Sequence, residues 1–74
     1  MECYQNLSGN SGVTFYDIGK DCIVLTFKTG GTYVYDYTAP GKAHVEAMKQ
    51  LAIAGKGLST YINRHVRENY ARQL

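Results

Sequence analysis

The chain has 74 residues, a net charge of +2 and a hydrophobic fraction of 45%, which suits one small domain with a modest core. The single proline and the absence of repetitive tracts argue against a disordered chain. No apolar run approaches the roughly 20 residues of a membrane helix, and no basic segment precedes an apolar stretch near the start, so we expect a cytoplasmic protein with no membrane partner.

Positive charge is concentrated in the second half of the chain. Residues 1–41 carry two lysines and four acidic residues, a net charge of −2, whereas residues 42–74 carry six basic and two acidic residues, a net charge of +4. This asymmetry is typical of proteins that bind anions, and a solvated helix surface has the same composition. The cysteines, Cys3 and Cys22, are too few for a disulfide framework and too far apart for a metal or redox pair.

The first half of the chain has the pattern of a small sheet. Residues 1–12 are polar and rich in turn-forming residues, and we expect a flexible N-terminal arm that is at best loosely docked. Residues 13–74 are then a single domain. Apolar side chains alternate along residues 13–18, 22–28 and 32–37, which predicts three strands. Glycine-containing reversals separate them, so the strands form an antiparallel meander.

The loop between the second and third strands decides which face the tyrosines occupy. An even loop places Tyr33, Tyr35 and Tyr37 opposite the apolar side chains of the second strand, as an exposed platform on which bases could stack. A three-residue loop that ends in a left-handed glycine places them on the same face and builds a denser core. We favour the second arrangement because Thr29-Gly30-Gly31 suits such a loop, and the exposed platform stays open as the alternative.

Two helices are predicted after the strands. Pro40 cannot continue a strand ladder, and the apolar spacing beyond it predicts a helix over 42–54 that ends at Gly55. A second helix is predicted over 59–71 with Ser59 as its N-cap. The fold class is therefore α+β, a three-stranded meander covered by two C-terminal helices. On the surface of the first helix, Glu46 can pair weakly with Lys49 or with Gln50.

Motifs for catalysis and cofactor binding are missing. The sequence has no nucleophile elbow, no nucleotide-binding P-loop, and no paired cysteines or histidines at zinc spacing. His44 and His65 have no carboxylate or nucleophile placed beside them by helical spacing. The segment Gly55–Ser59 offers backbone amides and a lysine at a helix start, as an anion site would, and a plain helix–helix turn explains it as well. We predict no enzymatic activity, no metal and no cofactor.

Asn63, Arg64 and Arg67, with His65 beside them, form the sharpest cluster of candidate binding residues. The guanidinium group of arginine offers a planar set of donors that matches phosphate oxygens, and an adjacent asparagine can bond a base edge or a sugar hydroxyl. At helical spacing the two arginines project together. The competing interpretation is that both are solvated, with Arg64 paired to Glu68 four residues on.

The order of several short segments resembles the KTSC domain family. These segments are Tyr16-Asp17-Ile18, Ile23–Phe27 followed by Gly30, Tyr33-Val34-Tyr35, and Tyr61–Arg67 followed by Tyr70. The family consists of small bacterial and phage-type proteins and of C-terminal segments of some lysyl-tRNA synthetases, and its hallmark is a central Tyr-x-Tyr. The chain departs from the family pattern at Ala39-Pro40 and at the Gly55–Thr60 junction. The resemblance implies a small domain without an established activity, and the link to a tRNA ligase suggests RNA binding.

These observations predict a small non-enzymatic domain that binds nucleic acid weakly, with RNA as the favoured partner. Its contacts are predicted to be Arg64 and Arg67 on phosphates, Lys28 and Lys56 as an extension of the basic track, and Asn63, Tyr33 and Tyr35 on sugar or base. The alternative is a module for homodimerisation or for binding a protein partner through an exposed sheet edge or apolar patch.

Overall fold

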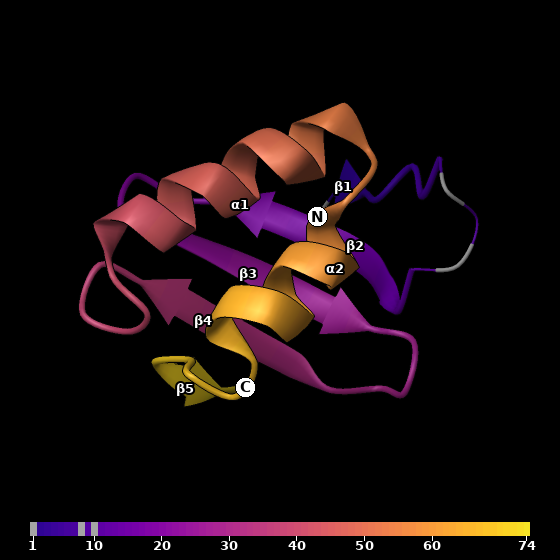
Figure 1. Ribbon diagram of the computed structural model, residues 1–74. Helices are drawn as coiled ribbons and strands as arrows, with labels where there is room; N and C mark the ends of the chain where they lie inside the picture. The colour runs from indigo at the N-terminus through magenta and orange to yellow at the C-terminus, as the bar shows by residue number, and fades with distance from the viewer. Residues whose placement is uncertain (1, 8, 10) are drawn as a thin grey trace.

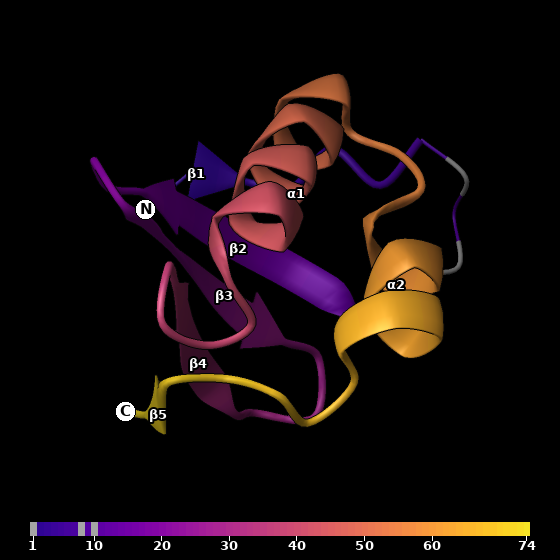
Figure 2. The same ribbon diagram turned by 60° about the vertical axis from the view of Figure 1, so that its left-hand side comes forward.

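The structure is a computed structural model that describes residues 2–7, 9 and 11–74. The described residues form an antiparallel sheet of five strands with its helices on one face (Figures 1 and 2). The strands, which lie side by side in chain order, are β1 (Glu2–Cys3), β2 (Val13–Ile18), β3 (Cys22–Phe27), β4 (Thr32–Asp36) and β5 (Arg72–Gln73). The helical segments are α1 (Lys42–Ala54), α2 (Leu58–Tyr61) and the π-helix η1 (Ile62–Val66), which continues α2.

The α+β class and the central meander β2–β4 are confirmed, and the two outer strands were not predicted. None of the helices in the described part of the chain is long and apolar enough to cross a membrane.

The hairpin register decides the position of the tyrosines. Ile23 pairs with Tyr35 and Leu25 with Tyr33, so these four side chains share one face of the sheet. The reversal is a turn in which Gly30 N–H donates to Phe27 O (2.9 Å), and Gly30 has the positive φ of 104° that glycine tolerates. The predicted odd loop is confirmed, one residue earlier than predicted, and so is the core-facing position of Tyr33 and Tyr35. The same prediction is wrong for Tyr37, which follows the end of β4 and is 37% exposed.

Helix α1 has the predicted bounds and buries the predicted face. Val45, Met48 and Ala52 are at most 1% exposed, and they pack on the sheet with Ile23 and Leu25. Gly55 ends the helix in the left-handed conformation, with its N–H directed to the carbonyl oxygens of the last turn.

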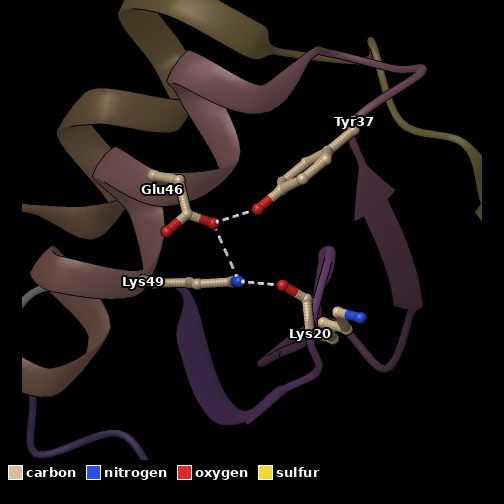
Figure 3. Close-up of polar contacts among 4 residues, drawn as sticks. All are labelled: Lys20, Tyr37, Glu46 and Lys49. Atoms are coloured by element: carbon tan, nitrogen blue, oxygen red, sulfur yellow. Dashed lines mark hydrogen bonds and ion pairs between the residues drawn. The ribbon is translucent and has the colours of Figure 1, made fainter.

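Lys49 was predicted to lie on the exposed surface of α1, but the structure buries it. Its side chain is about 10% exposed, and its Nζ donates to Lys20 O (3.0 Å) in the β2–β3 turn and contacts Glu46 Oε2 at 2.8 Å (Figure 3). The Tyr37 hydroxyl donates to the same Glu46 oxygen at 2.8 Å (Figure 3). The predicted pair between Glu46 and Lys49 is confirmed, and it belongs to a cluster that fastens a sheet turn to α1.

The second helix ends earlier than predicted. It leaves the α-helical conformation after Tyr61, and Arg67 N–H donates back to Ile62 O (2.6 Å) across η1. The prediction of a helix to residue 71 is wrong because β4 has a free edge with unpaired backbone groups. Residues 71–74 satisfy that edge: Ala71 N–H donates to Val34 O, and β5 pairs with β4.

Ser59 is also not the N-cap, which is Gly57. The Ser59 hydroxyl is hydrogen-bonded to Ser11 Oγ and accepts from Gly12 N–H (3.1 Å), so it joins the helix to the segment that enters β2. The Leu58 N–H donates to the Tyr4 hydroxyl at 3.3 Å. One amide of the anion site considered for this junction therefore already has a partner.

Residues 2–7 are docked rather than forming a loose arm. Glu2 and Cys3 pair with β2, and Tyr4 is 3% exposed within the core. Leu7 N–H donates to Gly55 O at 2.7 Å, which ties the segment to the end of α1. Burial of one large aromatic side chain explains the docking of an otherwise polar segment. The parts of the arm prediction that concern residues 1, 8 and 10 lie outside the described residues.

Candidate functional site

A cavity of about 600 Å³ opens between the β3–β4 hairpin and the segment from η1 to β5. This volume falls within the roughly 300–1,000 Å³ of small-ligand sites. Part of the lining comes from the hairpin, and the rest comes from the end of the second helix and the turn after it. The lining residues are Phe27, Thr29, Tyr33, Tyr35, Ile62, Asn63, Arg67, Glu68 and Tyr70.

One wall of the cavity is aromatic. The ring centres of Tyr33 and Tyr70 are 4.6 Å apart with planes at 45°, and Phe27 meets Tyr33 edge-on at 5.6 Å. Tyr35 completes the cluster and meets Tyr70 edge-on, with ring centres 6.2 Å apart. Such offset and edge-to-face contacts are the favourable arrangements of aromatic rings. Tyr33 and Tyr70 remain partly exposed, so a planar ligand can reach them.

Tyr35 supports this wall from within. It is 1% exposed. Burial is the main cause that raises the pKa of its hydroxyl to about 12, with smaller contributions from Tyr33 and Tyr70. The hydroxyl is therefore neutral at physiological pH. Because Tyr35 offers almost no surface, its predicted contact with a base is not available in this conformation.

The position of the Tyr33 ring depends on a glycine. A Cβ atom placed on Gly31 would lie 2.7–2.9 Å from the ring and hydroxyl of Tyr33, which is closer than real contacts allow. The ring therefore folds back over the loop at a residue that has no side chain.

The polar side of the cavity depends on an unusual backbone conformation. Arg67 has φ 44° and ψ −114°, and Asn69 N–H donates to Val66 O at 2.7 Å. These are the dihedral angles of the first central residue of a type II′ turn, a position that favours glycine. Arginine there stores strain of the kind that clusters at functional sites, and a π-helix directly precedes it.

The charged groups at this rim are exposed and unpaired within the described residues. The ion pair found among the described residues joins Lys49 and Glu46, and neither of these residues lines the cavity. Arg67 and Glu68 are exposed, and the predicted pair between Arg64 and Glu68 is not formed. The guanidinium group of Arg67 is thus available to an external anion.

The structure brings together some of the predicted binding residues. Four of them line this same cavity: Tyr33, Tyr35, Asn63 and Arg67. Arg64 is exposed on η1 and does not line it, because the π-helix and the turn at Arg67 break the helical spacing that aligned the two arginines.

Lys28 and Lys56 do not line the cavity. Lys28 lines a separate hollow beside β2, with Tyr4 and Phe15 among its other residues. Lys56 is exposed in the turn between α1 and α2 and does not line the cavity. The predicted continuous basic track is therefore not present as one surface around the cavity.

Sequence reasoning missed Glu68 and Tyr70 as site residues. Tyr70 fits the apolar stripe of a longer helix, at four-residue spacing from Val66, and that spacing gave no sign of a turn. The one local signal is Asn69, a residue type that favours turns.

Comparisons with family models, with curated proteins and with solved structures find no match for this chain. The described residues contain no group of three or more His, Cys, Asp or Glu side chains that could hold a metal ion. The cavity offers an aromatic face for stacking, a guanidinium group for an anion, and an amide and a carboxylate as hydrogen-bond donors and acceptors.

Proposed function

We propose that the protein binds single-stranded RNA weakly, with one nucleotide seated in the cavity. The observation that carries this proposal is the convergence of Tyr33, Tyr70, Asn63 and Arg67 on one concave surface. Single-stranded nucleic acid is recognised by stacking of unpaired bases on aromatic rings, together with cationic contacts to phosphate. An RNA partner accords with the predicted cytoplasmic location.

Each part of a nucleotide has a counterpart at the cavity. A base would stack on the exposed parts of Tyr33 and Tyr70, which is worth about 1–3 kcal/mol per base at comparable sites. The guanidinium group of Arg67 would contact a phosphate, and Asn63 would contact the sugar hydroxyl or a base edge. Arg64, which directly follows Asn63, would reach a flanking phosphate of an extended strand.

Few phosphate contacts imply low affinity and a measurable dependence on salt. Neutralisation of one or two phosphates of a single strand gives a slope of about −0.7 to −1.4 in log K against log salt concentration. Since neither Lys28 nor Lys56 lines the cavity, we expect them to contribute only long-range attraction. The proposed KTSC relationship points to the same partner class and stays a prediction.

The test is titration of a fluorescent single-stranded RNA of mixed sequence, followed by anisotropy at low and moderate salt. Arg67→Gln should weaken binding at least fivefold, and Lys56→Gln is the matched control because it removes one positive charge from the α1–α2 turn, outside the cavity. Equal losses in both variants would reduce the effect to net charge, and absence of binding by the wild-type protein would refute the proposal.

The predicted alternative, a homodimer or protein partner, is favoured by one observation. The helices cover one face of the sheet (Figure 2), and Phe15 is 43% exposed. Phe15 precedes Tyr16, which pairs with the buried Leu25, so Phe15 points to the uncovered face. Sedimentation velocity over a hundredfold concentration range decides this point, and a constant monomer would rule out the homodimer.

A further inference from the structure

The two histidines of the chain lie close together although they are far apart in the sequence. His44 belongs to the first turn of α1 and His65 to η1, and their ring centres are 6.0 Å apart. Tyr61 contacts both rings, at 4.5 Å from His65 and 5.8 Å from His44 between ring centres. None of these three residues lines the RNA cavity.

The hydrogen bond of Tyr61 orients one of the two imidazoles. Its hydroxyl oxygen lies 2.7 Å from His44 Nδ1. When Nδ1–H donates to this oxygen, the opposite nitrogen, Nε2, carries the free lone pair. Metal-binding histidines commonly use their second ring nitrogen in this way, since the hydrogen bond fixes both tautomer and ring direction.

The spacing of the rings suits one shared ion. With metal–nitrogen distances of about 2.0–2.1 Å and about 1.1 Å from nitrogen to ring centre, two imidazoles on one ion have ring centres about 4.4 Å apart when they bind at a right angle and about 6.3 Å apart when they bind on opposite sides. The observed 6.0 Å lies inside this range, near the opposite-side limit. His44 is half-buried and His65 is exposed, so water can reach an ion held between them.

We propose that His44 and His65 bind one late first-row divalent metal ion, such as Cu²⁺, Ni²⁺ or Zn²⁺, with Tyr61 as a positioning residue. Imidazole nitrogen is a preferred ligand for these ions, and Cu²⁺ binds most tightly in this series. The two histidines are the protein ligands, and water completes the coordination. The sequence alone predicts no metal because the histidines are not at zinc spacing, and the packing of η1 on α1 brings them together.

The test is isothermal titration calorimetry of the protein, produced without a polyhistidine tag, with Cu²⁺ and with Zn²⁺. Because thiols also bind these ions, the titration uses a Cys3→Ser/Cys22→Ser background. We expect one ion per chain, and we expect His44→Gln and His65→Gln each to lower the affinity at least tenfold. Single variants that each retain affinity within twofold would mean independent surface histidines and would overturn the shared site, as would absence of binding to the parent protein.

Tyr61→Phe tests the positioning role. It should lower the affinity by about tenfold, within the range found when a hydrogen-bond partner of a metal ligand is removed. Nitrogen-15 NMR of the two imidazoles supplies a readout that simple loss of packing would not move: the tautomer of His44 should change, while amide spectra show an intact fold. An unchanged His44 tautomer with unchanged affinity would remove Tyr61 from the site.

Discussion

Replacing Arg67 by glycine should stabilise the protein and weaken the proposed RNA binding. Arg67 occupies the first central position of the turn formed by residues 66–69, at φ 44° and ψ −114°. A side chain at these angles is strained, whereas glycine adopts them readily. The substitution also removes the guanidinium group from the rim of the cavity.

The expected gain in stability is about 1 kcal/mol. Strain at a sparsely populated backbone conformation costs of order 1–3 kcal/mol. Against this, glycine makes the unfolded chain more flexible, which costs roughly 0.5–1 kcal/mol. The Arg67 side chain is exposed and unpaired among the described residues, so little packing energy is lost. For a domain of this size the net gain corresponds to a Tm about 4–8 °C higher.

Urea denaturation and RNA titration of three proteins, the wild type, Arg67→Gly and Arg67→Ala, separate the two effects. Both variants should bind RNA at least fivefold more weakly, as expected for Arg67→Gln, but only the glycine variant should gain stability, because alanine keeps the Cβ atom that causes the strain. Equal midpoints for the glycine and alanine variants would refute the claim of strain. Retained binding by both would refute the role of Arg67 in the site.

The other predictions concern the hairpin loop and the Lys49 cluster. Gly31→Ala should displace the Tyr33 ring and weaken RNA binding, whereas Gly30→Ala should destabilise the fold by about 1 kcal/mol through its positive φ and leave Tyr33 in place; paired RNA and urea titrations check both. Lys49→Met should lower the free energy of unfolding by about 1–2 kcal/mol, measured in urea, because the hydrogen bond to Lys20 O is lost. The hydrogen bonds from Lys49 and Tyr37 hold the pKa of Glu46 below its usual 4.5, so its contribution is present above about pH 4.5 and is lost as the pH falls through the lower folded-state pKa. The difference in urea midpoint between wild type and Glu46→Gln should accordingly be larger at pH 6 than at pH 3, and a constant difference would contradict this.

The elements that follow from local pattern were predictable, and those that depend on a sheet edge were not. The apolar spacing of residues 42–54 predicts helix α1, and Gly30 indicates a β3–β4 loop with an odd number of residues. Both signals can be read directly from the sequence. Strand β5 has no apolar alternation of its own. It forms because β4 presents unpaired backbone groups, a cause that appears only once the meander is folded.

The candidate site shows the same division. Asn63, Arg67 and Tyr33 were recognisable by residue type, because arginine, asparagine and tyrosine are the side chains that recognise nucleotides. The exclusion of Arg64 could not be predicted, since helical periodicity places it beside Arg67 and only the π-helix and the turn separate them. Tyr35 is buried because of the register between β3 and β4. The sequence left two registers open, one for an even loop and one for a three-residue loop.

The pairing of β5 with β4 and the formation of the cavity depend on the same turn. The turn at residues 66–69 ends the helix, and the chain beyond it both places Tyr70 against Tyr33 and delivers residues 71–74 to the edge of β4. A helix continued to residue 71 would leave that edge unpaired and would carry Tyr70 away from the hairpin. The strained Arg67 is therefore maintained by the hydrogen bonds of β5 and by the aromatic contact on the other side of the turn. Loss of either should release the turn and the cavity together, which makes the edge strand part of the site even though it does not line it.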